Sequence, residues 1–452
     1  MSELRAIVLA AGKGTRMQSA RPKVLHQLCG KSMLWYVLRA LRDAGAGEVT
    51  VVTNGDVLAH VDAIARDAGH ERVATVLQEP QLGTGHAVAT ALQSLAPHAA
   101  ATLLVLNGDM PLIDARLVRR TADACGSGLS LVTARMPLPS SFGRVVRDGS
   151  RVSRIVEARD ASEDELALDE MNAGLYAFDE VKLRRAIAEL RPDNAAAEYY
   201  VTDTIRYFSS NGEPISPVVA EDYRGVLGVN DRVELAAAGR ELNRRLCEGH
   251  MRSGVTITDP ATTYLEPDLD LAADVTILPN TTLGRGSRVG AHSEIGPNTR
   301  LHNAHVGEHV TVTDSIVVDS TVGDFALIGP WSHIRAHTDV GTAARIGNFV
   351  EVKAAHLAPG VKAVHLAYVG DAAVGERTNI GAGTITCNYD GTRKNRTTIG
   401  KDVFIGSNSS LVAPLSIGDG AATGAGTVVI RDVAVGERVV GNPARALPSK
   451  TR

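Results

Sequence analysis

Residues 265–301 read LEPDLDLAADVTILPNTTLGRGSRVGAHSEIGPNTRL, and an aliphatic residue returns at every sixth position without a break. The series is Leu265, Leu271, Ile277, Leu283, Val289, Ile295 and Leu301. An α-helix repeats every 3.6 residues, so side chains at this spacing would turn around a helix rather than share one side of it. A coil with three flat faces of six residues points one aliphatic residue per face inward, and stacked coils then share one interior.

The same period returns twice more along the second half of the chain. One run is Val322, Ile328, Ile334, Val340, Ile346 and Val352, and another is Ile399, Ile405, Leu411, Ile417, Thr423, Val429 and Val435. We predict a parallel β-helix of roughly ten coils between Gly254 and Gly436, with small residues at the tight corners and an interior too narrow for aromatics. A sandwich of short strands is the alternative, and so many evenly spaced positions disfavour it.

The first half alternates apolar strands with helices, which predicts an α/β, Rossmann-like domain with a largely parallel sheet. The expected strands are 5–10, 48–53, 73–77 and 102–106, and the expected helices are 33–44, 57–67 and 85–95. A capped helix over 230–249 is the expected connector. We therefore expect a domain at 1–228, a linker helix at 229–250 and the β-helix at 251–452. Ligands of such sheets bind beyond the carboxyl ends of the strands, where the polar segments 12–23 and 107–109 lie.

The loop after the first strand, Gly12-Lys13-Gly14-Thr15-Arg16-Met17, has the composition of a phosphate-binding turn. The loop does not match the nucleotide-binding pattern GxxxxGK[ST]. It is also an incomplete GxGxxG dinucleotide fingerprint, because Met17 stands where the last glycine would be. Its glycines let backbone N–H groups approach phosphate, and Arg16 and Lys23 add positive charge.

Composition narrows the class of protein. The chain has 452 residues and a formal net charge of −4, with 4% aromatics and 44 glycines. This balance disfavours a nucleic-acid partner, and the lack of a long apolar run disfavours a membrane partner. Met1–Arg5 shows no signal-peptide pattern, and the cysteines form no C-x-x-C pair, so we expect a cytoplasmic protein without disulfides or a zinc site. The cysteines are Cys29, Cys125, Cys247 and Cys387.

One interruption of the six-residue repeat is informative. Ile380 and Ile399 are 19 residues apart rather than 18, and residues 388–396 between them are polar and basic. We expect an extruded loop that serves a ligand or a neighbouring subunit, with a tolerated surface insertion as the alternative.

Both halves resemble known families. The glycine loop with Pro22-Lys23, the stretch from Gln81 to Ala87 and Asn107-Gly108-Asp109 resemble sugar-nucleotide pyrophosphorylases, and the six-residue repeat resembles the left-handed β-helix of hexapeptide acyltransferases. The left hand comes from that resemblance alone. Together with 348–353, 365–371 and 379–391, the chain resembles, over nearly its whole length, the bacterial bifunctional N-acetylglucosamine-1-phosphate uridyltransferases/glucosamine-1-phosphate acetyltransferases.

For the first half, the resemblance implies a uridyltransferase site that uses Mg²⁺ and UTP. Arg16 and Lys23 are implied as catalytic cations, and Asp109 and Asn230 as the metal ligands. The implied nucleotide and sugar contacts are Leu9, Ala10, Ala11, Gly12, Lys23, Gln78, Gly83, Thr84, Asn107, Gly108, Asp109, Gly143, Glu157, Asn172 and Asn230. This family often has an aromatic residue at the position of Asn107, so we expect modestly changed nucleotide packing there.

For the second half, the resemblance implies an acetyltransferase site with His365 as the catalytic base. The implied sugar-phosphate contacts are Arg335, Lys353, Tyr368 and Asn379. The implied acetyl-CoA contacts are Ala382, Asn388, Tyr389, Ser407, Ala425 and Arg445, of which Asn388 and Tyr389 also match sugar-phosphate contacts. Ala336 stands where this family often has proline. The C-terminal end departs further from the family, and Arg445 is the candidate for the family's late cofactor-binding arginine because of its position in the sequence.

The implied activity is synthesis of UDP-N-acetylglucosamine, a precursor of peptidoglycan and lipopolysaccharide, by a homotrimer acting on sugar phosphates, UTP and acetyl-CoA. Acetyl transfer to an amine needs a base to take the amine proton and donors to stabilise the oxyanion. Nucleotidyl transfer brings two phosphates together, so it needs positive charge and correct alignment. Two alternatives remain: a nucleotidyltransferase whose solenoid is structural or acylates another substrate, and a non-catalytic regulatory subunit. The residues around His365 disfavour the first, and the cationic loop disfavours the second.

Overall fold

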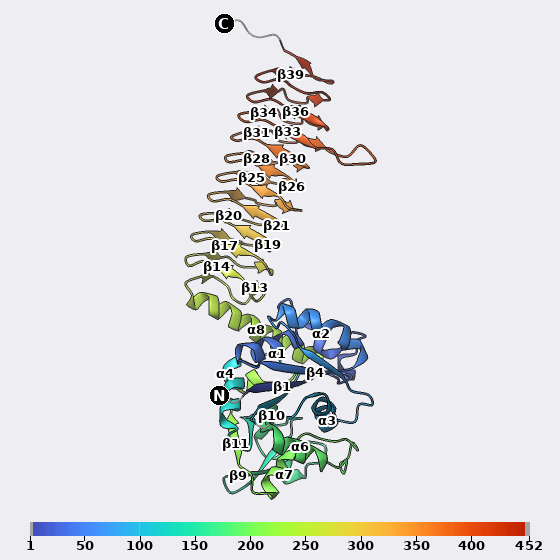
Figure 1. Ribbon diagram of the computed structural model, residues 1–452. Coiled ribbons are helices and arrows are strands. Elements are labelled where there is room, and N and C mark those ends of the chain that lie inside the picture. Colours follow the sequence, from blue (N-terminus) through green and yellow to red (C-terminus); the bar gives the residue numbers. More distant parts are fainter. Residues whose placement is uncertain (1–2, 99, 448–452) are drawn as a thin grey trace. The chain divides into compact units, whose positions relative to one another are not determined.

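The computed structural model describes residues 3–98 and 100–447, and the chain divides into two compact units, Met1–Leu242 and Asn243–Arg452. The division falls inside helix α8 (Arg232–Arg252) (Figure 1). This helix covers the segment expected to connect the two halves, starting two residues later and ending three residues later than 230–249. Among the described residues, no helix is long and apolar enough to cross a membrane.

The first unit is built on a mixed sheet with the strand order β11-β7-β10-β6-β1-β4-β5. The strands are β1 (Leu4–Leu9), β4 (Glu48–Thr53), β5 (Ala74–Leu77), β6 (Thr102–Asn107), β7 (Leu129–Arg135), β10 (Glu170–Asp179) and β11 (Ile215–Val219). Four neighbouring pairs are parallel, and β10 runs antiparallel to both of its neighbours. A hairpin of β8 (Arg144–Asp148) and β9 (Arg151–Val156) joins this sheet through β10.

Helices connect and cover the strands of this sheet. They are α1 (Met33–Asp43), α2 (Gly55–Asp67), α3 (Thr84–Ser94), α4 (Ala115–Ala124), α5 (Glu163–Leu166), α6 (Glu180–Ala188) and α7 (Asp203–Ser210). Every strand and helix expected in the first half is present, with ends shifted by at most two residues. The caps explain several of the starts: the side chains of Ser32, Asn54 and Asp114 each accept a hydrogen bond from the backbone of the following turn.

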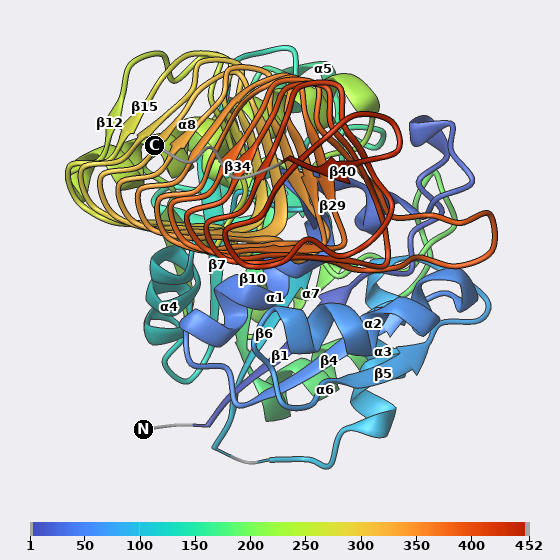
Figure 2. The same cartoon turned by 90° about the horizontal axis from the view of Figure 1, so that it is seen from above.

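The second unit is a left-handed parallel β-helix, as the hexapeptide repeat implies. Its short strands form a 12-stranded sheet along one face and a 17-stranded sheet that wraps the other two faces. In the first sheet, β12 (Thr256–Ile257) to β39 (Arg438–Val440) are parallel, and β40 (Arg445–Ala446) closes the stack antiparallel to β39. Seen along its axis, each coil of this unit lies over the preceding one (Figure 2).

The remaining strands of the β-helix are two to seven residues long. On the first face they are β15 (Thr276–Ile277), β18 (Glu294–Ile295), β20 (Thr311–Val312), β22 (Leu327–Ile328), β25 (Arg345–Asn348), β28 (Lys362–His365), β31 (Asn379–Ile380), β34 (Phe404–Ile405) and β37 (Ala422–Thr423). On the other faces, those used below are β23 (His333–Arg335), β26 (Glu351–Lys353), β29 (Tyr368–Gly370), β30 (Ala372–Val374), β32 (Ile385–Cys387) and β33 (Thr397–Ile399).

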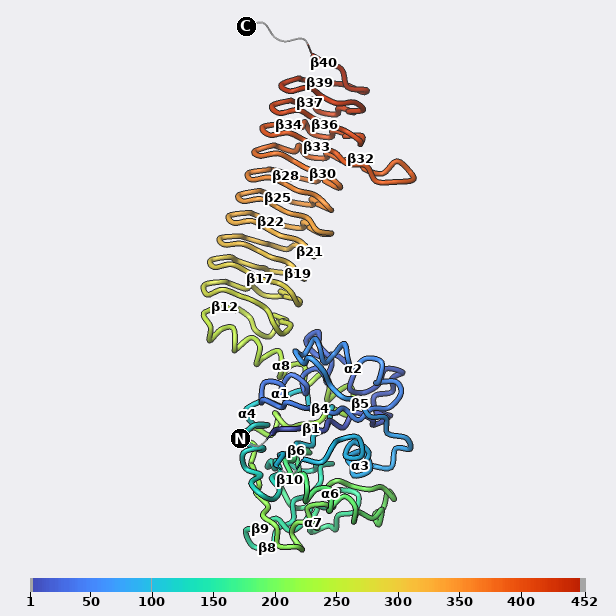
Figure 3. The backbone as a smooth tube through the Cα atoms, in the orientation of Figure 1, coloured from blue at the N-terminus to red at the C-terminus, as the bar shows by residue number. Residues whose placement is uncertain are grey.

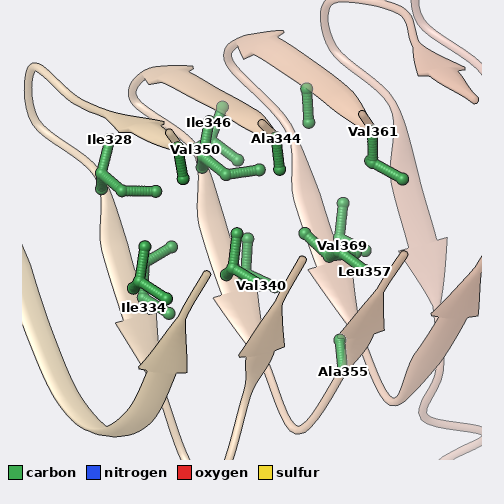
Figure 4. Close-up of a cluster of buried hydrophobic side chains, with 14 of the residues drawn as sticks. Ile328, Ile334, Val340, Ala344, Ile346, Val350, Ala355, Leu357, Val361 and Val369 are labelled. Carbon is green, nitrogen blue, oxygen red and sulfur yellow. The ribbon is translucent and has the colours of Figure 1, made fainter. Parts of the chain in front are cut away.

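The six-residue repeat supplies the interior of this β-helix (Figure 4). Ile328, Ile334, Val340 and Ile346 are buried at successive faces, and the buried cluster contains no aromatic residue. One repeat position was predicted wrongly: Val435 is 77% exposed, and Val433 and Val439 are buried instead. The phase slips there because the last coil ends in the short turn before β39, so the chain reaches the interior two residues earlier.

The reason for the glycines beside the repeat also differs from expectation. Gly290 and Gly341 have no left-handed backbone, but a Cβ on either would lie 2.6 Å from the backbone of the next coil. Close stacking of the coils therefore excludes side chains there. Many tight corners are instead made by asparagine, aspartate and histidine in the left-handed region, whose short polar side chains tolerate it. A polar residue at such a corner can also link neighbouring coils: the Asn298 amide donates a hydrogen bond to Asp314 in the following coil at 2.7 Å.

The polar loop between β32 and β33 leaves the stack, as its insertion-like sequence predicts (Figure 3). All four cysteines are free thiols, and burial raises the pKa of Cys125 and of Cys247 to about 11. Neither of these two thiols is therefore ionised near neutral pH.

Candidate active sites

The phosphate loop begins at the carboxyl end of β1, beside the end of β6. Leu9 pairs with Asn107 in register, and Gly108 N–H donates to the Leu9 carbonyl at 2.9 Å. Gly14 adopts a left-handed conformation with φ of 60°, and the following short helical turn brings the chain back toward Lys23. The two polar segments expected at this edge therefore lie together there.

These segments enclose a cavity of about 580 Å³. Its lining includes Leu9, Ala10, Ala11, Gly12, Arg16, Lys23, Gln78, Gly83, Thr84, Asn107, Asp109 and Asn230. Gly108 lies buried behind the lining rather than in it. The structure thus gathers almost the whole expected nucleotide set around one space.

Gln78 and Thr84 are held in place on one side of this cavity. The Gln78 amide nitrogen donates to the Gly83 carbonyl at 3.0 Å and lies 3.1 Å from His86 Nδ1. Thr84 Oγ1 accepts the backbone N–H of Val201 at 3.0 Å. Such prior hydrogen bonding fixes both side chains before a ligand arrives, which lowers the entropic cost of binding.

Asp109 and Asn230 converge on a single cation, the ammonium group of Lys23. Lys23 Nζ donates to Asp109 Oδ2 in a short ion pair and to Asn230 Oδ1 at 3.1 Å. A carboxylate and an amide oxygen that meet within reach of one positive charge are the donor types that Mg²⁺ accepts alongside its waters. No group of three or more His, Cys, Asp or Glu side chains in residues 3–98 and 100–447 is placed to hold a metal. The pair therefore fits a partly hydrated Mg²⁺ rather than a fully enclosed metal.

A second cavity of about 560 Å³ adjoins the first, and Arg16, Asp109 and Asn230 line both. It is lined on its other side by Gly143, Glu157 and Asn172, the expected sugar contacts. Because the shared residues carry the charges, phosphates bound between the two cavities would meet at these groups.

Glu157 and Asn172 are well supported by neighbours in the sugar cavity. Burial raises the pKa of Glu157, and the Thr202 hydroxyl, which donates to it at 3.1 Å, opposes that rise. Asn172 N–H donates to the Gly143 carbonyl at 2.8 Å, so these two contacts are linked through their backbones.

Several lining residues escaped the sequence prediction, among them three with charged or phenolic side chains. Arg159 and Glu198 line both cavities, and Tyr200 lines the sugar cavity. Arg159 stands two residues after Glu157, a residue already singled out, so its charge was the available signal. Asn107, the departure from the usual aromatic residue, lines both cavities and packs against Gly174, where a Cβ would come within 2.7 Å of its amide.

In the β-helix, cationic and polar residues gather beside the extruded loop. Arg335 and Lys353 are neighbours in the register of β23 and β26, and Arg335 Nε donates to Glu351 at 2.8 Å. Asn388 donates to the Tyr368 hydroxyl at 3.2 Å, which places the start of the loop over β29. Arg335, Lys353, Tyr368 and Asn388 are thus brought together on one face.

Lys394 is a further cation that sequence reasoning missed. It comes from the extruded loop, and contact with the neighbouring Lys353 ammonium lowers its pKa. Two neighbouring ammonium groups beside Arg335 favour an anionic ligand, and the Asp371 carboxylate, 3.4 Å from Lys353 Nζ, offsets part of their charge. The basic composition of the loop was the signal for this residue.

His365 lies at the corner of the β-helix in a column that runs through successive coils. It pairs with Asn348 in register, and the corner hydrogen bonds continue from Gly383 N–H to Leu366, from Asn408 N–H to Ala382 and from Gly426 N–H to Ser407. Ala382, Ser407 and Ala425 therefore occupy the same corner as His365, one per coil. An elongated ligand along this corner would pass the imidazole.

Four expected features of this half stand apart. Asn379 lies on β31, on the first face, and Tyr389 is exposed near the tip of the loop, where its hydroxyl donates to Gly391 at 2.7 Å. Arg445 is exposed on β40 beyond the last coil. Ala336 and His337 both have φ near 60°, which proline cannot adopt, so this corner differs from one built with proline.

Two kinds of transferase are defined by this fold and these cavities: a nucleotidyltransferase domain and a hexapeptide-repeat acyltransferase. Residues 6–166 match the family described as the MobA-like NTP transferase domain, and residues 396–431 match the hexapeptide repeat of succinyl-transferase. The chain is also similar over nearly its whole length to curated proteins called bifunctional protein GlmU. It is 43% identical to that of Brevibacillus brevis (96% of this chain, 94% of the relative).

The corresponding identity is 42% for a Mycobacterium species (97% of this chain, 89% of the relative) and 40% for Staphylococcus haemolyticus (95% and 94%). This chain belongs to the GlmU family. It is accordingly a bifunctional uridyltransferase and acetyltransferase, with nucleotide, sugar-phosphate and acetyl-CoA substrates.

Proposed function

We propose that the two sites act in sequence to make UDP-N-acetylglucosamine. The second unit transfers acetyl from acetyl-CoA to the amine of glucosamine 1-phosphate, and the first joins the product to UMP from UTP with release of pyrophosphate. The observation that carries the nucleotidyl step is the convergence of Lys23, Asp109 and Asn230 where the two cavities adjoin. Both co-substrates are metabolites of the cytoplasm, and we propose that the enzyme works there.

In the uridyltransferase site, a phosphate oxygen of the sugar phosphate attacks the α-phosphorus of UTP. The bond from that phosphorus to the bridging oxygen breaks, and pyrophosphate leaves. Arg16 and Lys23 offset the repulsion between the two anions, which is the main barrier to their approach. No general base is needed, because the attacking phosphate is already ionised.

Asp109 and Asn230 would hold Mg²⁺, and the bound ion would neutralise phosphate charge that develops during transfer. The support lies in the two oxygens, which already share one cation in this structure. Gln78, Gly83 and Thr84 would read the uracil, and Gly143, Glu157 and Asn172 would hold the sugar.

In the acetyltransferase site, His365 would take the proton from the amine of the sugar as its nitrogen attacks the thioester carbon. The carbon–sulfur bond then breaks, and the proton is available to the leaving thiolate. Arg335, Lys353 and Lys394 would bind the phosphate of the sugar. Ala382, Ser407 and Ala425 would line acetyl-CoA along the corner that carries His365.

We also propose a homotrimer that assembles through this corner. Trp331, Phe349 and Leu366 follow one another on successive coils there, 56%, 58% and 64% exposed, and the two rings stack at 5.1 Å. An apolar ladder of this kind beside a catalytic histidine fits burial against a neighbouring copy. Replacing Trp331 and Phe349 with serine should then yield monomers in sedimentation and remove acetyl transfer, whereas an active monomer of the unchanged chain would contradict the trimer.

Two assays on the full chain test the activities separately. Thiol release is measured with acetyl-CoA and glucosamine 1-phosphate, and pyrophosphate release with UTP and N-acetylglucosamine 1-phosphate. His365→Ala should abolish only thiol release, and Asp109→Ala only pyrophosphate release. Loss of both activities from one folded variant would contradict two independent sites.

A further inference from the structure

Tyr176 brings a hydroxyl from the protein core to the wall of the sugar cavity. Its ring packs beside Phe178 at 5.8 Å in the buried core under the sheet, and the residue is only 2% exposed. Its oxygen accepts a hydrogen bond from the Asn172 amide nitrogen at 2.6 Å, and both residues line the cavity. The core thus holds the ring rigidly while its polar end meets the ligand space.

This contact fixes the orientation of the Asn172 side chain. Asn172 Oδ1 accepts the Gly174 N–H at 3.3 Å, and Nδ2 donates to Tyr176, so each end of the amide has a different partner. The nitrogen carries two N–H bonds, of which Tyr176 uses one. The second is left for a ligand in the cavity.

The Tyr176 hydroxyl also keeps a proton to donate. A phenol has one O–H donor besides its acceptor lone pairs, and the bond from Asn172 uses only a lone pair. In the part of the chain that the structure describes, this O–H donates no hydrogen bond, and the hydroxyl's one partner is the Asn172 amide. Burial raises the pKa of Tyr176, so the proton stays in place through the neutral range.

We propose that Tyr176 positions the sugar for uridylyl transfer by presenting its O–H together with the Asn172 N–H as a pair of donors to an oxygen of the sugar 1-phosphate. The proposal rests on the proposed uridyltransferase reaction. The oxygen belongs either to the acetamide or to a ring hydroxyl, since both accept hydrogen bonds. Glu157, on the same cavity, supplies an acceptor and so completes recognition of a sugar that offers both groups.

The test is Tyr176→Phe, which keeps the ring and removes the hydroxyl. Tyr36→Phe is the matched control, because Tyr36 is also buried in this unit and donates to the Leu28 carbonyl at 2.9 Å. We expect Tyr176→Phe to raise KM for N-acetylglucosamine 1-phosphate about five- to tenfold, the effect of one lost hydrogen bond. KM for UTP and thiol release should stay within about twofold, and Tyr36→Phe should leave both KM values unchanged.

A double-mutant cycle with Asn172→Ala adds a readout that a structural role would not move. If the Tyr176 O–H itself donates to the sugar, Tyr176→Phe should raise KM further in the Asn172→Ala background, whereas a Tyr176 that only supports Asn172 would leave that variant unchanged. An unchanged KM for the sugar phosphate in Tyr176→Phe, or equal rises for both substrates, would overturn the proposal. If the unchanged chain releases no pyrophosphate, the proposed reaction fails instead, which separates the two failures.

Glucosamine 1-phosphate as an alternative acceptor identifies the oxygen. If Tyr176→Phe weakens the preference for the acetylated sugar, the acetamide oxygen is the partner. If Tyr176→Phe raises KM for both sugar phosphates by the same factor, a ring hydroxyl is the partner. Either result supports the donor pair.

Discussion

The Asn388 side chain donates a hydrogen bond to the Asp371 carboxylate, which ties the start of the extruded loop to the coil before it. The same residue holds the other end, since the Asp371 carbonyl accepts the Thr397 N–H at 3.2 Å. Its carboxylate also lies 3.4 Å from Lys353 Nζ. Asp371 therefore joins both ends of the loop to a cation of the candidate acetyltransferase site.

Replacing Asp371 with alanine should loosen the loop and weaken acetyl transfer. Trypsin cuts after Arg393, Lys394 and Arg396, so the rate of cleavage in the loop measures how often it opens. We expect faster cleavage and a roughly tenfold loss of thiol release, because one charged hydrogen-bond partner is gone. Pyrophosphate release should not change.

Asp402→Ala is the matched control for this change. Asp402 pairs with Arg377 at 2.7 Å on an exposed corner of the same β-helix, away from the loop. Cleavage and activity should resemble those of the unchanged chain. Slow acetyl transfer in Asp371→Ala without faster cleavage would show that the carboxylate does not act through the loop.

Chelation of divalent cations should separate the two activities. We expect pyrophosphate release to stop and thiol release to continue, because Asp109 and Asn230 offer Mg²⁺ a hard oxygen pair in the first site and the proposed acetyl transfer uses no metal. Asp109→Asn should raise the Mg²⁺ concentration for half-maximal activity by more than tenfold, since the carboxylate is the single charged ligand. Equal dependence of the two reactions on Mg²⁺ would contradict this assignment.

Glu157→Gln should make the protein more stable at neutral pH. Burial raises the folded-state pKa of Glu157 above its ordinary value of 4.5, so the ionised form is disfavoured in the folded state. The folded protein then binds more protons than the unfolded chain, and stability falls as pH rises from 4.5 through the raised pKa. Above that window the cost is constant, and below pH 4.5 it vanishes.

Urea unfolding of the two proteins at about pH 7.5 and at about pH 4 measures this effect. The glutamine variant should unfold at higher urea only at the higher pH, and it should bind the sugar phosphate less well. A larger difference at acidic pH would have the wrong sign for a buried carboxylate. Glu157 would then stabilise the folded protein, rather than serve as a binding group whose burial lowers stability.

Features of the fold that depend on the spacing of residues were predicted from the sequence. Features that depend on packing between separate coils were not. The period of six was enough for the β-helix because one aliphatic residue per face is a local rule, repeated coil after coil. Val435 broke the rule because the turn before β39 shifts the phase, and nothing local records that shift. The glycines were found, but their cause is the backbone of the next coil, which no single coil contains.

The candidate sites divide in the same way. Lys23, Asp109 and Asn230 were predicted because they stand in motifs, although 207 positions separate the first from the last. Tyr176 was not predicted, because in an apolar strand its sequence context is that of a core residue. Its bond to Asn172 spans an irregular register in β10, where four residues of β10 lie opposite two of β7, so the two residues, already on one face of the strand, come closer together.

Glu180 offers a test of stability in the first unit without touching either site. It is 1% exposed, accepts from Arg5 and Arg184 at 2.8 Å, and also receives the His98 N–H at 3.2 Å. Arg5 is itself buried, so Glu180→Ala leaves a positive charge with only the half-exposed Glu48. We expect a loss of about 3–5 kcal/mol in the free energy of unfolding, the usual cost of breaking a buried pair.

Trp35 fluorescence in a Trp331→Phe background reports this unfolding, because these are the only two tryptophans and Trp35 is buried in the first unit. Glu221→Ala is the control: its carboxylate is 88% exposed and pairs with Arg120, so the change should cost less than about 1 kcal/mol. Thiol release should persist in both variants. Equal losses of stability in the two would mean that the buried position of Glu180 adds nothing to the strength of its ion pairs.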